Sequence, residues 1–300
     1  MVFPPFEPDR PGIRRRRFGA IPLRTLLPNL ITLLALCAGL TAIRMSVEGR
    51  LELALAAIVF AAMLDGVDGR IARLLKGTSR FGAELDSLAD FVNFGVAPAL
   101  ILYFWGLHEL KSVGWISALI FAICAGLRLA RFNVMIDDPN RPAWAGNFFT
   151  GMPAPAGAIT VLLPIYLYFL GVDGGIFETW LVFIYTLAIA FFMVSRLPVF
   201  SGKKIGQRVP AEMVLPVFMV TIILLALLIS YPWQFLSVGT LLYLGSLPFG
   251  WLSYRAYERK AAAEMAAASP AATPSMEASS PPVAGERPDL SASDRPSRLN

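Results

Sequence analysis

The sequence predicts an all-α fold, a polytopic membrane helical bundle of about eight transmembrane helices with an N-terminal amphipathic interfacial helix and a disordered C-terminal tail. Three observations predict it. Of the 300 residues, 56% are hydrophobic and only 16% are charged, whereas an average soluble domain is about a quarter charged. Apolar runs of roughly 20 residues, the length that crosses a bilayer, follow one another along the chain. Lys and Arg gather in alternate connecting segments. Together these observations exclude an ordinary soluble domain.

Residues 1–26 are predicted to form a basic cytoplasmic N-terminus. They contain Arg10, the run Arg14 to Arg17, and Arg24. From about Phe18 to Leu27 apolar and basic positions are mixed, as in a short helix that lies on a membrane surface. No small-residue cleavage site bounded by polar sequence follows, so the first apolar run is expected to be a retained span and not a signal peptide.

Residues 27–255 are expected to form the membrane-embedded domain. Backbone groups in lipid must be satisfied within their own segment, so the spans are predicted to be helices and no strand is expected. Cys37 and Cys124 lie inside apolar runs and are interpreted as small buried hydrophobic residues, not as a disulfide or a metal site. The eight predicted spans cover roughly 27–47, 51–75, 84–105, 113–135, 153–171, 178–196, 211–230 and 234–254.

Residues 256–300 are predicted to be a disordered cytoplasmic tail. From Lys260 onward the chain is dominated by Ala, Ser, Pro and Glu and has no aromatic residue. Such a composition cannot bury a core.

The positive charges predict the orientation of the bundle. With the N-terminus in the cytoplasm, 23 of the 26 Lys and Arg lie on the cytoplasmic side, and only Arg44, Arg50 and Lys111 lie outside. This distribution follows the positive-inside rule, with both termini inside. Topology and anionic lipid head groups therefore explain the net charge of +5, and no nucleic-acid partner is expected.

Four aspartates lie where the second predicted span ends and the third begins. Asp65 and Asp68 are three residues apart, and Asp86 and Asp90 are four apart, so each pair shares one face of a helix. The short connection makes the two helices antiparallel neighbours, and the four carboxylates can converge at their cytoplasmic end. Near-membrane acids are commonly functional, although pairing with nearby arginines would be the simpler explanation.

Four neighbouring carboxylates repel one another and need a compensating cation. Carboxylate oxygens suit a hard divalent ion, and no His or Cys is at hand to favour zinc. Small residues interleave the acids, and they would leave room for a ligand or would serve helix packing. We expect Mg²⁺ or Mn²⁺, which the pattern does not distinguish.

The spacing Asp65-x2-Asp68-Gly69-x2-Ala72-Arg73-x8-Gly82-x3-Asp86-x3-Asp90 resembles the complete signature of the CDP-alcohol phosphatidyltransferase family. The resemblance implies that two divalent ions are held by Asp65, Asp68, Asp86 and Asp90, and that Asp90 is also the catalytic general base. It further implies that the CDP part of the lipid donor is surrounded by Gly69, Ala72, Arg73 and Gly82. A homodimer is expected on the same basis.

Further stretches resemble the membrane-embedded phosphatidylserine synthase branch of this family. They cover residues 89–99, 126–133, 147–158 and 193–204, and eight spans fit that branch. The resemblance implies transfer of the phosphatidyl group of CDP-diacylglycerol to L-serine, with CMP as the other product. A bacterial inner membrane is expected.

Three polar residues are candidates for contact with the acceptor or with a phosphate. Arg128 and Arg131 are three residues apart and share a helix face, where a guanidinium could bind the carboxylate of an amino acid. They could equally bind a lipid phosphate, or mark the cytoplasmic membrane edge. Asn93 follows Asp90 by about one turn and is within reach of an acceptor beside the base, or packs in the core.

The same sequence features are compatible with other functions. The same reaction could use glycerol 3-phosphate, choline or an inositol derivative as acceptor. A membrane transporter of metal ions or small solutes would need acids near the bilayer midplane and a second, related half, and the chain has no second Asp-rich half. A non-catalytic membrane protein with a structural metal is the third alternative.

Overall fold

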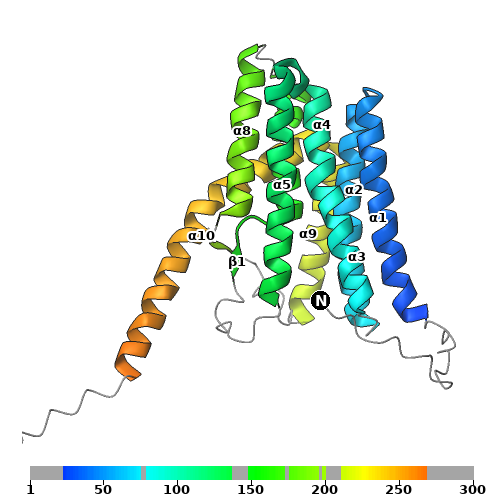
Figure 1. Ribbon diagram of the computed structural model, residues 1–300. Helices are drawn as coiled ribbons and strands as arrows, with labels where there is room; N and C mark the ends of the chain where they lie inside the picture. The colour runs from blue at the N-terminus through cyan, green and yellow to red at the C-terminus, as the bar shows by residue number, and fades with distance from the viewer. Residues whose placement is uncertain are drawn as a thin grey trace, which may run out of the picture. The chain divides into compact units, whose positions relative to one another are not determined.

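The computed structural model describes residues 23–75, 79–136, 148–172, 176–195, 198–200 and 211–268, and this part of the chain is almost entirely helical (Figure 1). The chain divides into two units, Met1–Tyr257 and Glu258–Asn300. The bundle belongs to the first unit. The predicted interfacial helix lies mostly outside the described residues, and its last residues form the first turn of α1.

Six helices coincide with six of the predicted spans. In Figure 1 α1 runs beside α2 and α5 runs beside α8, with α3 (Arg80–Asp90) and α4 (Ala97–Trp105) between the two pairs. Their positions follow from the apolar runs, because a run of bilayer length can satisfy its backbone only as a helix. The bounds are α1 (Leu23–Val47), α2 (Leu51–Leu74), α5 (Lys111–Ile136), α8 (Ile176–Val194), α9 (Ala211–Ser230) and α10 (Pro232–Ala268).

The third predicted span consists of three consecutive pieces. The α-helix α3 (Arg80–Asp90) passes into the π-helix η1 (Phe91–Val96), which passes into α4 (Ala97–Trp105). A 3₁₀ turn, η2 (Leu107–Leu110), then leads into α5. The hydrophobic pattern of the sequence gives no sign of these changes from α-helix to π-helix or to a 3₁₀ turn.

The fifth predicted span breaks at Leu162 into α6 (Ala154–Val161) and α7 (Leu163–Phe169). The break follows from Pro164, which has no N–H to donate to the Thr160 carbonyl four residues earlier. The Tyr185 hydroxyl of α8 donates to that carbonyl instead, at 2.7 Å. A side chain of a neighbouring helix thus satisfies the backbone group that proline leaves free.

Two short strands contradict the expectation of a fold without strands. β1 (Phe148–Thr150) pairs antiparallel with β2 (Pro198–Phe200), and Phe149 lies opposite Val199. The segments that follow α5 and α8 satisfy part of their backbone in this way. Gly151, directly after β1, has a φ of +79°, and a Cβ there would lie 2.6 Å from the Met193 carbonyl oxygen. Only glycine fits this turn against the end of α8.

The core of the first unit lies where η1 and α4 meet their neighbours. It includes Leu55 and Ile58 of α2, Phe94 of η1, Ile101 of α4 and Phe121 of α5, all fully buried. The two cysteines are not part of it. Cys37 is exposed on α1 and Cys124 is half-buried, so the expectation that both are buried was wrong.

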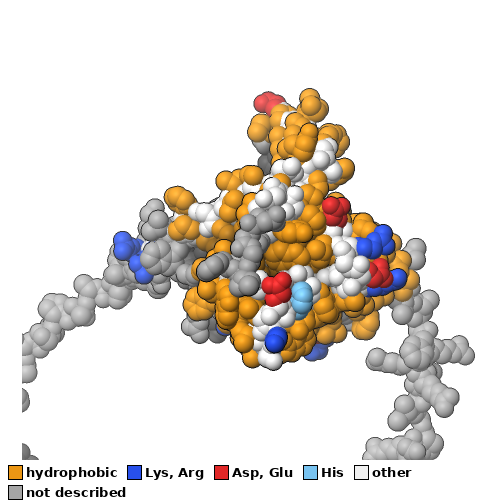
Figure 2. Space-filling model, turned by 90° about the horizontal axis from the view of Figure 1, so that it is seen from above, with side chains coloured by type: hydrophobic (Ala, Val, Ile, Leu, Met, Phe, Trp, Pro, Cys, Tyr) orange, Lys and Arg blue, Asp and Glu red, His pale blue; other side chains and the backbone are white. Residues whose placement is uncertain are grey.

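The described surface is strongly apolar, and in the view of Figure 2 hydrophobic side chains cover most of it. By length and composition, four helical stretches of the described chain can cross a membrane: Leu26–Val47, Arg80–Trp105, Leu107–Met135 and Glu212–Ser230. Apart from Leu228, every described side chain of α9 from Glu212 to Ser230 is exposed. Exposed apolar helices of this length need lipid around them, so the chain is an integral membrane protein.

The C-terminal boundary differs from its prediction. α10 continues to Ala268, although the sequence predicted disorder from residue 256. The Ala-rich stretch there contains good helix formers, which explains the continuation. Residues 269–300 of the predicted tail lie outside the described residues.

Candidate metal centre

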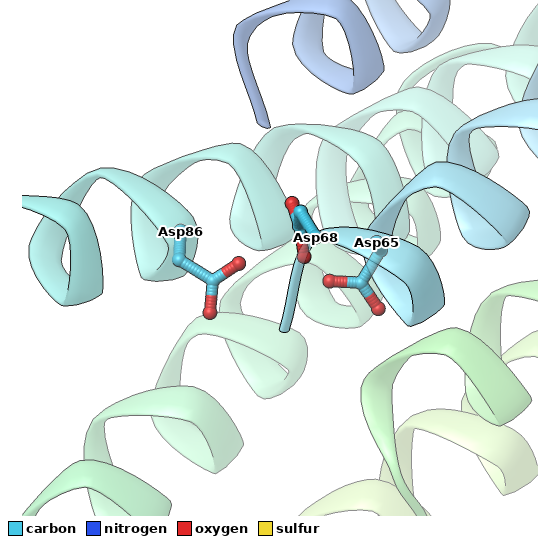
Figure 3. A group of neighbouring side chains, drawn as sticks. All are labelled: Asp65, Asp68 and Asp86. Atoms are coloured by element: carbon cyan, nitrogen blue, oxygen red, sulfur yellow. The ribbon is translucent and has the colours of Figure 1, made fainter. Parts of the chain in front are cut away.

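Three of the four predicted acids converge between two helices. Asp65 and Asp68 project from α2 and Asp86 from α3, and one carboxylate oxygen from each lies within 4.8 Å of the others. Figure 3 shows the three carboxylates directed into the same space. The beginning of α3 is fixed by Ser79, whose hydroxyl accepts a hydrogen bond from the Gly82 N–H at 3.0 Å. This N-cap sets where the helix starts and therefore which face carries Asp86.

Asp90 lies beside this group of three. Its carboxyl group is within hydrogen-bonding reach of the Asp65 carboxyl group. Since Asp90 is the last residue of α3, the π-helix begins directly after it. π-Helical turns within α-helices are frequent at functional sites. The structure thus brings Asp90 to the edge of the carboxylate group.

Acids with a purely structural role would be paired with arginines, and the four acids have no such partners among the described residues. No basic side chain of the described residues forms a salt bridge with any of them, and Arg70, Arg73 and Arg80 are exposed. Asp68 is only 4% exposed, and the other three are half-buried. Carboxylates this close together and partly removed from water need a cation. A hard divalent ion with oxygen ligands fits this donor set.

Thr32 of α1 contacts the site, and the sequence did not single it out. Its hydroxyl donates to the Asp68 carboxylate at 2.8 Å and is buried. The same hydroxyl lies 3.1 Å from the Pro28 carbonyl oxygen. A hydrogen bond to a metal-binding carboxylate fixes its orientation. A threonine in an apolar span gives no signal of such a role, because its partner is on another helix.

The surface of α2 around Gly69 is open. Among the described residues, no atom from outside the local helix backbone lies within 4 Å of the position that a Cβ on Gly69 would occupy, and the same holds for Gly66. Arg73 is exposed, and its Nε donates to the Gly69 carbonyl at 2.9 Å. Ala72 lies on α2 between them. Packing between the described helices does not explain Gly66 and Gly69, and their missing side chains leave this face of α2 open.

Gly82 has a different environment. A Cβ on this residue would lie 2.7 Å from Oδ1 of Asn29, so α3 and α1 approach closely here. Gly82 therefore has a packing reason to be glycine. Helix packing is the alternative to contact with the donor that the sequence left open.

Arg128 of α5 is the basic residue that interacts with the acids from another helix. It is 8% exposed, and its guanidinium carbon lies 5.1 Å from the centre of the Phe132 ring. It interacts electrostatically with Asp90. No carboxylate of the described residues lies within salt-bridge distance of it. A buried guanidinium without a paired anion can bind an anionic group of a ligand.

Close packing of α5 against η1 brings Arg128 near Asp90. A Cβ on Gly126 would lie 3.1 Å from the Phe91 ring, so the absence of that side chain lets the two elements approach. Nearer the end of α5, the Asn133 amide donates to the Ser87 hydroxyl at 2.9 Å. These contacts hold α5 against α3 and η1 on both sides of Arg128.

The other two candidate acceptor residues lie elsewhere. Arg131 donates from Nη1 to the Val194 carbonyl at 2.6 Å and so binds the end of α8. Asn93 is 1% exposed and packs against Gly39 of α1, where a Cβ would clash with its Oδ1. That oxygen has no hydrogen-bond partner among the described residues. Of the three candidates, Arg128 is the one close enough to an acid of the site to interact with it electrostatically.

Comparisons with known proteins match most of the chain. Residues 25–194 match the family model described as CDP-alcohol phosphatidyltransferase, and residues 212–248 match CDP-alcohol phosphatidyltransferase 2. A CDP-diacylglycerol–serine O-phosphatidyltransferase of Mycobacterium leprae is 41% identical over 241 residues, which cover 80% of this chain and 78% of the relative. The protein of that name from Helicobacter pylori strain 26695 is 35% identical over 223 residues, covering 73% and 88%. An archaetidylserine synthase of Methanothermobacter thermautotrophicus is 34% identical over 140 residues, covering 45% and 55%.

Proposed function

Because the chain belongs to the CDP-alcohol phosphatidyltransferase family, we propose that it transfers the phosphatidyl group of CDP-diacylglycerol to the hydroxyl of L-serine, giving phosphatidylserine and CMP. The family membership expected from the signature is confirmed by the matching residues 25–194. The assignment of serine is supported by the relatives that carry the serine transferase name at 41% and 35% identity. The observation that carries the proposal is the convergence of Asp65, Asp68 and Asp86 within 4.8 Å beside Asp90.

The carboxylate group fits the divalent metals that the family resemblance implies. Asp65, Asp68 and Asp86, together with Asp90, would hold two ions, Mg²⁺ or Mn²⁺, through oxygen ligands. When bound, such ions neutralise charge on the diphosphate oxygens and on the departing CMP. Thr32 would keep the Asp68 carboxylate oriented toward them.

The proton transfer is assigned to Asp90. Its carboxylate takes the proton of the serine hydroxyl, and the serine oxygen then forms a bond to the lipid-side phosphorus. The bond from that phosphorus to the bridging diphosphate oxygen breaks, and CMP leaves with the electron pair. The proton on Asp90 passes to solvent. A general base must be within reach of the hydroxyl it deprotonates, and Asp90 lies at the edge of the carboxylate group, next to Arg128.

The CDP part of the donor is assigned to the open face of α2. Gly69 leaves space for the nucleotide, Ala72 is the next small residue along the helix, and the exposed Arg73 supplies positive charge for the diphosphate. Gly82 completes the signature on α3, where its role in packing against Asn29 supports the position of Asp86. The acyl chains of the donor remain in the bilayer.

Arg128 is proposed to bind the serine carboxylate. A buried guanidinium without a salt-bridge partner among the described residues matches one carboxylate charge. Asn93 and Arg131 are further candidates for acceptor or phosphate contact. Arg131 would have to give up its hydrogen bond to Val194, and Asn93 would have to turn from α1.

We further propose a homodimer of eight-span subunits in the bacterial inner membrane, surrounded by membrane lipids, with both termini and the active site on the cytoplasmic side. The eight predicted spans correspond to helices of the described chain, with the third and fifth divided. The distribution of 23 of 26 Lys and Arg supports this orientation.

The test is release of CMP from CDP-diacylglycerol by the purified full-length protein. L-serine and divalent metal should both be required, and phosphatidylserine should form in equal amount. Metal-dependent release that needs glycerol 3-phosphate, choline or an inositol derivative would retain the reaction and overturn serine as acceptor. Folded protein that releases no CMP with any alcohol would overturn the proposal in favour of transport or a structural metal.

A further inference from the structure

Tyr243 of α10 carries a buried hydroxyl that the proposed mechanism does not use. Its oxygen is inaccessible to solvent and has no hydrogen-bond partner among the described residues. The ring packs against the hydrophobic core of the first unit. A buried hydroxyl without a partner is costly, so such a group in the interior of a membrane protein calls for a reason.

The charge with which this hydroxyl interacts belongs to the proposed acceptor site. Tyr243 interacts electrostatically with the Arg128 guanidinium, which in turn interacts with Asp90. Arg128 is 8% exposed and has no salt-bridge partner in the described part of the chain. A cation and a hydroxyl, both hydrogen-bond donors, therefore interact with each other's charge, and neither has an acceptor among the described residues.

The position of Tyr243 along the chain separates it from the donor site. The four aspartates and the donor residues of α2 and α3 lie within residues 25–194, which match the general family model. Tyr243 lies within residues 212–248, which match the second model. Tyr243 therefore lies on a different segment of the chain from the four aspartates and the proposed donor residues.

We propose that the Tyr243 hydroxyl donates a hydrogen bond to the carboxylate of the amino-acid acceptor bound by Arg128, and that Tyr243 is a specificity-determining residue of this enzyme. The inference rests on the proposed function, because it presupposes an acceptor with a carboxylate. One carboxylate would supply both missing acceptors, with two oxygens for two donors. An alcohol without an anionic group, such as serinol, would leave both donors unpaired, and a site built in this way rejects it.

The experiment compares Tyr243→Phe with the matched variant Tyr168→Phe in the full-length protein. Both substitutions remove only a phenolic hydroxyl, and Tyr168 is 44% exposed on α7. In Tyr243→Phe the KM for L-serine should rise about tenfold, the typical loss for a hydrogen bond to a charged group. The KM for CDP-diacylglycerol and the metal requirement should not change. Tyr168→Phe should match the wild type in every parameter.

A second readout separates recognition from packing. Serinol has the hydroxyl and amine of serine but lacks its carboxylate, so the ratio of kcat/KM for serine over serinol measures carboxylate recognition. This ratio should fall about tenfold in Tyr243→Phe. An unchanged serine KM and ratio would overturn the inference, as would an equal loss of activity with both acceptors. Wild-type protein that shows no serine-dependent CMP release would instead overturn the proposed function itself.

Discussion

Asp90 differs from the other three acids of the centre in its surroundings. Asp65, Asp68 and Asp86 offer oxygens to one common point, whereas Asp90 lies against Asp65 on one side and interacts with Arg128 on the other. Among the four acids it is the one that interacts with Arg128, which is why we propose that it deprotonates the incoming hydroxyl. Its position at the end of α3, where the π-helix begins, sets it apart along the backbone as well.

Replacing Asp90 by Asn tests this role. Asp90→Asn keeps the shape of the side chain but removes the base, so serine-dependent CMP release should fall by roughly 10²–10⁴-fold. The thermal unfolding temperature in detergent should stay near that of the wild type. The control is Glu84→Gln, an exposed acid on the same helix, which should remain fully active. Wild-type turnover in Asp90→Asn, with intact metal dependence, would refute the assignment.

Replacing Thr32 gives a second prediction that concerns a single side chain. Thr32→Val keeps the size of the residue and removes the hydrogen bond to Asp68. Because this bond orients a metal-binding carboxylate, the metal concentration needed for half-maximal activity should rise about tenfold. Thr41→Val removes an exposed hydroxyl that bonds only to the Cys37 carbonyl in the same helix and should have no effect. Equal metal titrations of the two variants would show that Thr32 does not support Asp68.

Among the helices, the packing of α5 against η1 positions the proposed acceptor side of the site. Gly126 and Gly95 both lie against the Phe91 ring, and a Cβ on Gly95 would lie 3.0 Å from that of Ala125. This close approach is possible because both positions lack side chains. It holds Arg128, two residues beyond Gly126, beside Asp90.

Gly126→Leu should separate these elements. The added side chain would meet the Phe91 ring, and overpacking of this kind costs about 1–3 kcal/mol. The protein should unfold at a lower temperature, and the KM for serine should rise more than the KM for CDP-diacylglycerol, because α2 and α3 are not displaced. Gly239→Leu places the same side chain on an exposed face of α10 with open space around it. If the two variants were equally stable and active, the close packing would have no functional role.

Across the whole molecule, the centre concentrates negative charge between α2 and α3. Neither arginines nor water compensates it fully, since no salt bridge reaches the four acids from the described residues and Asp68 is buried. Without a bound cation the carboxylates repel one another. We therefore expect a divalent ion to link the two helices and to stabilise the fold as well as support the reaction.

Chelation should consequently lower both activity and stability. Removal of divalent ions should abolish serine-dependent CMP release and lower the unfolding temperature, and Mg²⁺ or Mn²⁺ should restore both. At a metal concentration 100-fold above the dissociation constant the stabilisation is about 2.7 kcal/mol. In Asp86→Asn, with one charge fewer, the temperature shift between chelator and metal should shrink. A chelator that leaves both quantities of the wild type unchanged would argue against a metal centre.

The sequence by itself determined where the helices lie and which acids share a face. The predicted span 51–75 coincides with α2 (Leu51–Leu74), and 211–230 coincides with α9 (Ala211–Ser230). Apolar runs of bilayer length leave the chain little choice, because the backbone must satisfy itself within each run. Helical spacing likewise placed Asp65 with Asp68, and the short connection to α3 brought Asp86 to them.

Only the tertiary structure decided what faces these acids from other helices. Arg128 and Arg131 share a face by spacing, yet one interacts with Asp90 and the other binds the Val194 carbonyl of α8. Thr32 contacts Asp68 from α1, and Tyr243 of α10 interacts with the charge of Arg128. No local pattern marks either residue. Spacing along one helix fixes the direction in which a side chain points, whereas its partner depends on how neighbouring helices pack.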